Sequence, residues 1–338
     1  MQKIHRARLR NAVLGALFGA VALGMTADAT PLWTTFGAPD SIGMFPLTIT
    51  AHNLIAGYYY DSNGIKHGFL RTPDGTVTAF DAPGAANGTV VTGANTAGDI
   101  TGSFLDYSVG NTSFVRKADG SFETFQYQSL PTYATAINAR GAVIGYTFVG
   151  VTYRAILRRA NGKYIALLPG VNAVPTAVNK DGVIAGLTIG SGQHVFVRAV
   201  TGDVTTFDVT GATAYAFVFI NAGGEVAGTY VDASNNYHGF VREPDGTLTT
   251  FDATGAGTGQ SQGTFAESID DHGNIVGCVT DSASATHGFV REVSGAMHTI
   301  DMPGAPFTCV LAISAAGRLV GRQGAGGFVA LPRVWQPR

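Results

Sequence analysis

Apolar and polar residues alternate along most of the chain after residue 30, and glycine interrupts the alternation at short intervals. An apolar residue at every second position predicts half-buried β-strands, whereas a helix spaces its apolar residues by about 3.6 positions. Residues 30–338 contain no convincing helical spacing. The pattern therefore predicts many short strands joined by tight turns.

The alternation is organised in a repeat, and its clearest mark is the phrase I-x-G. Successive glycines of this phrase are 45, 43, 41, 42, 49 and 44 residues apart. They are Gly57, Gly102, Gly145, Gly186, Gly228, Gly277 and Gly321. A period in this range is typical of β-propeller blades, each of which is built from four strands.

Each repeat begins with a predicted β-hairpin. Four residues before the I-x-G glycine lies a residue that tolerates the left-handed backbone of a tight turn. These residues are Asn53, Gly98, Gly141, Gly182, Gly224, Gly273 and Gly317. Three residues earlier, a short polar side chain can bond back to the backbone of the turn. These side chains belong to Thr50, Asn95, Asn138, Asn179, Asn221, Asp270 and Ser314.

A second predicted hairpin completes the repeat, as at Phe69, the turn residue Gly75 and the closing residue Phe80. The last repeat stops after Phe328, and its missing T-x-F phrase occurs instead at residues 34–36. A closed ring leaves no exposed sheet edge. The sequence therefore predicts an all-β fold: a seven-bladed β-propeller with four-stranded blades, closed by the N-terminal strand, which completes the last blade.

The phrase N-x-x-G-x-I-x-G, followed by H-G-F about ten residues further on, resembles the HAF-type extracellular repeats of bacteria. The nearest matches are residues 67–69, 238–240 and 287–289. The resemblance covers nearly all of residues 30–338. It implies an exported repeat protein, and it assigns no activity, cofactor or catalytic residue.

Residues 1–29 are predicted to be a secretory signal peptide. Four Lys and Arg residues precede an uncharged apolar stretch over residues 11–25, and small residues at Ala27 and Ala29 suit cleavage after Ala29. The stretch is shorter than the ~20 residues of a membrane-spanning helix, and an uncleaved anchor is the alternative. Residues 30–338 are then expected to form a single propeller domain without a membrane span, secreted or periplasmic, and monomeric.

Charge and cysteine content narrow the possible partners. The chain has 21 Lys and Arg against 23 Asp and Glu, and removing residues 1–29 leaves 17 against 22. Nucleic acid requires clustered basic residues, so we exclude it as a partner. Cys278 and Cys309 could form a disulfide in an oxidising compartment, or could remain small buried apolar side chains.

Three repeated sets of polar residues could carry chemistry. The H-G-F histidines lie in separate repeats, so hydrogen bonds within their own blades are expected rather than a zinc site. The arginine in the same strand, such as Arg71, could bind anions, but an ion pair or hydrogen bond within its own blade is preferred, and the aspartate after the closing residue, such as Asp81, is one candidate partner. The aspartate after the second strand, such as Asp61, is predicted to stabilise a turn rather than bind calcium. No catalytic, cofactor-binding or metal-binding signature results.

Function on a repeat scaffold usually lies where the repeats differ. The longest departure, between Phe251 and Ile269, holds Gln260, Gln262 and Glu267 as candidate ligand-facing residues. Aromatic residues near the strand ends could stack on sugars. They are Tyr58, Tyr59, Tyr60, Phe104, Tyr107, Tyr146, Phe148, Tyr153, Tyr230 and Tyr237.

The favoured hypothesis is a non-catalytic binding or interaction scaffold, with carbohydrate or an exported protein as the partner. A polysaccharide- or small-molecule-processing enzyme is the first alternative, and glycoside hydrolysis would need two carboxylates ~5–9.5 Å apart at the channel. The acids that could supply them are Asp99, Asp181, Glu225, Glu267 and Asp271. A structural cell-surface component is the second alternative.

Overall fold

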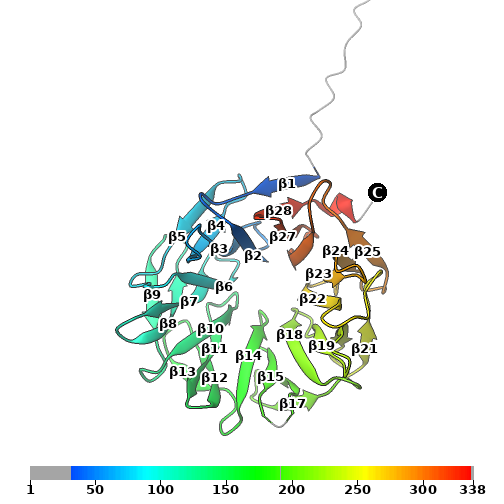
Figure 1. Ribbon diagram of the computed structural model, residues 1–338. Helices are drawn as coiled ribbons and strands as arrows, with labels where there is room; N and C mark the ends of the chain where they lie inside the picture. The colour runs from blue at the N-terminus through cyan, green and yellow to red at the C-terminus, as the bar shows by residue number, and fades with distance from the viewer. Residues whose placement is uncertain (1–31, 191, 336–338) are drawn as a thin grey trace, which may run out of the picture. The chain divides into compact units, whose positions relative to one another are not determined.

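The structure is a computed structural model that describes residues 32–190 and 192–335. The predicted signal peptide lies outside these residues. Within them the chain forms 28 strands and one short 3-10 helix, η1 (Pro332–Val334). The strands are arranged in a ring (Figure 1). No helix in this part of the chain is long and apolar enough to cross a membrane.

The strands form antiparallel sets of four, which we call blades, and each blade runs from the centre of the ring outwards (Figure 1). The described residues make five four-stranded sheets and one eight-stranded sheet. The larger sheet consists of the β18–β21 and β22–β25 sets, which one parallel pairing joins, that of Tyr237 with Gly263.

The strand bounds follow the sequence repeat. The innermost strands are β2 (Gly43–Ile49), β6 (Thr89–Ala94), β10 (Thr132–Ile137), β14 (Ala173–Val178), β18 (Ala214–Ile220), β22 (Gly263–Ile269) and β26 (Cys309–Ile313). The second strands are β3 (Ile55–Tyr60), β7 (Ile100–Asp106), β11 (Val143–Val149), β15 (Ile184–Thr188), β19 (Val226–Val231), β23 (Ile275–Thr280) and β27 (Leu319–Gln323). The third strands are β4 (Lys66–Arg71), β8 (Gly110–Arg116), β12 (Thr152–Arg158), β16 (Val195–Arg198), β20 (Tyr237–Arg242), β24 (Thr286–Arg291) and β28 (Gly326–Ala330). The outermost strands are β5 (Val77–Phe80), β9 (Phe122–Phe125), β13 (Tyr164–Ala166), β17 (Val204–Phe207), β21 (Leu248–Phe251), β25 (Met297–Ile300) and β1 (Trp33–Phe36).

β1, the first strand of the described residues, belongs to the same sheet as β26, β27 and β28. β1 pairs antiparallel with β28, with Thr35 opposite Phe328. Met44 and Phe69 of the next blade pack in one apolar cluster with Val320 of β27. The predicted all-β fold with four-stranded propeller blades is confirmed.

The first hairpin of each blade has the predicted backbone. Asn53 has a φ of 60°, and the glycines at the equivalent positions have φ between 73° and 97°. The I-x-G glycine is required for a different reason, because a Cβ at Gly57 would overlap the carbonyl oxygen of Phe45 on the adjacent strand. Each innermost strand also carries a β-bulge, such as that between Pro46 and Thr48.

The repeated arginines join neighbouring blades. The Arg116 guanidinium lies 5.0 Å from the ring centre of Phe80, the closing residue of the preceding blade. The equivalent pairs are Arg71 with Phe36, Arg158 with Phe125, Arg242 with Phe207 and Arg291 with Phe251. The predicted hydrogen bond within the blade is present, since Arg116 donates to the carbonyl of Lys117, but the aspartate after the closing residue is not the partner of the arginine. The arginine ends its strand at one edge of the blade, whereas that aspartate follows an antiparallel strand and lies at the opposite edge.

Removing one of these arginines should weaken the contact between two blades. We expect Arg116→Ala to lower the free energy of unfolding by about 1–2 kcal/mol, through lost cation–π stacking and lost packing of the side-chain stem. Urea denaturation measures this change. Arg159, exposed on the β12–β13 turn, is the control, and Arg159→Ala should change stability by less than ~0.5 kcal/mol. Equal effects of the two substitutions would contradict the assignment.

Candidate functional site

The antiparallel order of the strands gives the ring two different faces. The turn face carries the hairpin turns after the innermost strands, such as residues 50–54. The loop face carries the loops between second and third strands and the connections between blades. Ligands meet different side chains on each.

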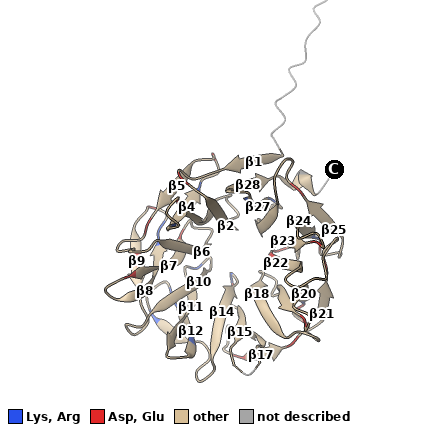
Figure 2. Ribbon diagram, in the orientation of Figure 1, with Lys and Arg blue, Asp and Glu red and all other residues tan. Residues whose placement is uncertain are grey.

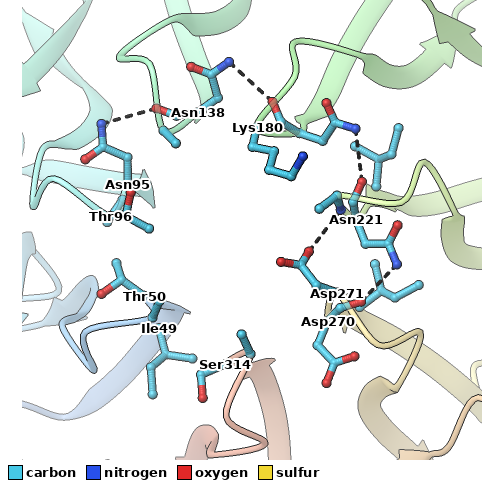
Figure 3. Close-up of a pocket in the computed structure, with 18 of the residues that line it drawn as sticks. Ile49, Thr50, Asn95, Thr96, Asn138, Lys180, Asn221, Asp270, Asp271 and Ser314 are labelled. Atoms are coloured by element: carbon cyan, nitrogen blue, oxygen red, sulfur yellow. Dashed lines mark hydrogen bonds between the residues drawn. The ribbon is translucent and has the colours of Figure 1, made fainter.

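A cavity of about 330 Å³ opens at the centre of the turn face. Every innermost strand contributes the same three positions to its wall: 49–51, 94–96, 137–139, 178–180, 220–222, 269–271 and 313–315. Figure 3 shows these residues facing a common opening. Lys180 and Asp271 bring charge to the wall, together with the buried Asp270.

Asparagine side chains around this opening donate hydrogen bonds to the backbone of the neighbouring blade (Figure 3). Asn138 Nδ2 donates to the carbonyl of Asn179, at 3.4 Å, while its Oδ1 accepts from the backbone of its own turn. The same link runs from Asn95 to Asn138, from Asn179 to Asn221 and from Asn221 to Asp270. It stops at Asp270, because an aspartate has no side-chain N–H to donate. The predicted turn bonding is confirmed, and these amides are occupied by the fold.

Four of the five candidate acids are also engaged with protein groups. Asp99 lies 3.2 Å from Lys117, Asp181 lies 2.7 Å from Lys180, and Asp271 accepts from the backbone N–H of Ala222. Glu225 accepts from the amide of Asn221. Each of these four carboxylates is therefore engaged with a group of its own blade or, for Asp271, of the adjacent turn.

The fifth acid, Glu267, lies on the innermost strand β22 at its β-bulge. The bulge positions of the two following blades hold Leu311 and Leu47, which pack with Phe265 and Phe307. Burial in these surroundings raises the pKa of Glu267 to about 8, although the nearby Arg322 acts in the opposite direction. At neutral pH the carboxyl group therefore keeps its proton and can donate a hydrogen bond.

The raised pKa makes stability depend on pH. Because the folded-state pKa of about 8 lies above the ordinary 4.5, the unfolded chain loses its proton first, and stability falls as pH rises between these values. Glu267→Gln cannot ionise, so its stability relative to the unsubstituted protein should grow from pH 5 to pH 9, by on the order of 4 kcal/mol. Urea denaturation at both pH values measures this, and a difference independent of pH would contradict the assignment.

On the loop face, each H-G-F histidine binds an aspartate of its own blade, as predicted. His67 Nδ1 lies 2.8 Å from Asp81, the candidate partner of the arginine. The equivalent pairs are His238 with Asp252 and His287 with Asp301. His194 forms a fourth pair with Asp208. The repeat pattern did not predict this pair, because His194 lies in the phrase H-V-F rather than H-G-F. In residues 32–190 and 192–335, no group of His, Cys, Asp or Glu is arranged to hold a metal ion.

A second cavity, the loop-face cavity, has a volume of about 340 Å³ and lies over the first blades of the ring. Its wall includes Lys66, Asn87, Val90, Ser103, Asn111 and Tyr133. Apart from Val90, each of them presents a hydrogen-bonding side chain. The space can hold a small polar ligand, because binding pockets usually measure ~300–1,000 Å³.

Tyr133 is part of the wall of the loop-face cavity, and two further tyrosine rings lie beside another wall residue, Lys66. Lys66 Nζ lies 5.4 Å from the ring centres of both Tyr58 and Tyr60. Tyr133 stacks on Tyr146 with ring centres 5.1 Å apart and planes 11° apart. Phe148 and Tyr153 extend this second group. Tyr58, Tyr60, Tyr146, Phe148 and Tyr153 were candidates from the sequence, whereas Tyr133 lies on an innermost strand and was missed.

The remaining sequence candidates lie elsewhere. Gln260 and Gln262 are in the β21–β22 loop, where the Gln262 amide accepts from the backbone of Gly259, and Glu267 is separated from them in β22. Of the two interpretations left open for the cysteines, the structure has the disulfide: Cys278 and Cys309 are joined, with Cα atoms 4.9 Å apart. Lys and Arg are scattered over the ring rather than clustered (Figure 2).

No protein-family profile matches the chain, and no curated protein matches it in sequence. Solved structures do. A catalytically inactive variant of virginiamycin B lyase from Staphylococcus aureus, with quinupristin, has a TM-score of 0.60 at 12% identity, over 88% of this chain and 99% of the lyase. YCF48 bound to D1 peptide has a TM-score of 0.51 at 10% identity, over 89% and 96%. These likenesses show a β-propeller fold, and the fold alone.

Proposed function

We propose that this protein is an exported, non-catalytic binding propeller, and that the loop-face cavity binds carbohydrate. The observation that carries the proposal is the wall of this cavity, which contains Tyr133 and the lysine Lys66 that lies beside the rings of Tyr58 and Tyr60. A sugar has apolar C–H faces and a hydroxyl rim, so it is bound well by aromatic faces beside polar side chains. Tyr133 supplies the former, and Asn87, Ser103 and Asn111 supply the latter.

The wider architecture belongs to the same proposal. We infer a ring of seven blades closed by β1, because the repeat occurs seven times and the eight-stranded sheet divides at one parallel pairing. Export rests on the predicted signal peptide over residues 1–29 and on the resemblance to HAF-type repeats. A disulfide between Cys278 and Cys309 suits an oxidising compartment. The protein is proposed to act as a monomer.

Binding is favoured over catalysis because of how the acids are used. Asp99, Asp181, Glu225 and Asp271 are each engaged with a separate partner. Glycoside hydrolysis needs two carboxylates close together. The charged group that acts on Glu267 is the cation of Arg322 rather than a second carboxylate.

A glycan-binding screen with a matched pair of variants tests the proposal. We expect one class of oligosaccharide to raise the melting temperature of residues 30–338, since a ligand at 100 times its dissociation constant adds about 2.7 kcal/mol. Tyr133→Ala should weaken that glycan at least ~10-fold, a loss of about 1.4 kcal/mol. Titration calorimetry measures the affinity.

Tyr107 provides the control, because it is 77% exposed at the tip of the β7–β8 loop and does not line the cavity. Tyr107→Ala should bind as the unsubstituted protein does. Melting of both variants without ligand separates lost binding from lost folding. A cooperatively folded protein that responds to no glycan, or equal weakening by both substitutions, would reject the loop-face cavity as a carbohydrate site.

A further inference from the structure

The β10–β13 blade departs from the repeat at the loop face, and four of the other blades show what it lacks. In four blades a histidine Nδ1 lies 2.8–2.9 Å from the carboxylate that follows the outermost strand. In three of these, Nε2 also faces an aspartate after the second strand, at 3.5–3.6 Å. The nitrogen-bearing side chain is therefore flanked by carboxylates from its own blade.

In the β10–β13 blade the same three positions hold Arg154, Leu168 and Val149. Arginine, which is always charged, replaces histidine, and apolar residues replace both carboxylates. Arg154 is exposed, and among the ion pairs within residues 32–190 and 192–335 none includes it. The β10–β13 blade thus presents the cation of Arg154 without a carboxylate of its own beside it, whereas four other blades place an aspartate beside the equivalent histidine.

A cavity of about 410 Å³ lies at this position, and we call it the Arg154 cavity. Besides Arg154, its wall includes Tyr127, Ile156, Leu168, Pro169 and Val171. Val171 is 43% exposed, so apolar surface is open to water at the cavity. A ligand that suits this wall has one anionic group and an apolar body.

The wall formed by the β9–β10 loop is held in a particular conformation. Gln128, which lines the cavity, and Ser129 both have positive φ, 53° and 58°, which is uncommon for residues other than glycine. Tyr127 pairs with Leu130 across this turn, and its ring packs edge-on against Tyr164 at 5.2 Å. These contacts keep the loop beside Arg154, so the cavity is preformed.

We propose that the Arg154 cavity binds an organic monocarboxylate with an apolar body. The ligand's carboxylate pairs with the Arg154 guanidinium, where Asp81 and its equivalents pair with histidine in other blades. A planar guanidinium can hold a carboxylate through two parallel hydrogen bonds. The body of the ligand packs on Leu168, Pro169 and Val171. This site is separate from the loop-face cavity and goes beyond the carbohydrate binding proposed above.

Titration calorimetry with phenylacetate, and with its uncharged counterpart phenylacetamide, tests the charge requirement. Residues 30–338 should bind phenylacetate at least ~10-fold more tightly than phenylacetamide, as expected for a hydrogen-bonded charge pair. Arg154→Gln should remove this difference. Arg159→Gln, at the other end of the same strand, should preserve it. The proposal is overturned if the folded protein binds neither phenylacetate nor the peptide acid Ala-Ala-Phe. It is also overturned if Arg154→Gln binds phenylacetate as tightly as the unsubstituted protein does.

A second variant uses the repeat itself as a guide. Leu168→Asp restores a carboxylate of the protein beside Arg154, so it should compete with the ligand and weaken phenylacetate at least ~10-fold, provided that its melting curve remains cooperative. If a folded Leu168→Asp binds phenylacetate as tightly as the unsubstituted protein, the proposed carboxylate position is wrong.

The carboxylate can come from a free acid or from the C-terminus of a peptide, and the two sources are distinguished with Ala-Ala-Phe and its C-terminal amide. Tighter binding of the peptide acid than of phenylacetate identifies a peptide end, and the reverse order identifies a free acid. In either case the amide should bind at least ~10-fold more weakly than the acid. Equal binding of peptide acid and amide contradicts a carboxylate site.

Discussion

A four-stranded blade has two faces and can bury their apolar side chains only against its neighbours, so the structure depends on contacts between blades. Two polar interactions reinforce that packing. Arg116 stacks on Phe80 of the preceding blade, and Asn138 donates to the Asn179 carbonyl of the following blade. The first acts towards the outer edge of the ring and the second beside its central opening. Three pairs of neighbouring blades have both contacts, and others have one of them, so these polar contacts reinforce much of the ring that carries the cavities.

The sequence predicted the hairpins well because their chemistry is local. A turn that needs positive φ selects glycine or Asn53, and the polar residue that bonds to it lies three positions away. The partner of Arg116 could not be found in this way, since Phe80 belongs to the preceding repeat. The phenylalanine and the aspartate both recur in the repeat together with the arginine, so the repeat alone cannot tell which of them contacts it. The structure decides, because the arginine and the aspartate lie at opposite edges of the blade.

The candidate site was less accessible to sequence reasoning. Tyrosines were expected to form a platform, but Tyr133 reaches the loop-face cavity from an innermost strand, and its cavity partners Lys66 and Asn111 come from two other blades. Glu267 stands at a bulge, whose register no sequence pattern reveals. The repeat nevertheless makes Arg154 noticeable, because the other blades show which charges normally surround its position.

Pairing of β1 with β28 also orders the events of folding. β1 has no partner until β28 has been made, so the sheet that contains β1 stays incomplete while the strands between them are synthesised. Before that moment an incomplete ring has an unpaired strand edge and uncovered apolar faces, which favour association with other chains. Contacts between the two ends of the sequence also slow folding. Completion of this sheet therefore waits for the synthesis of β28.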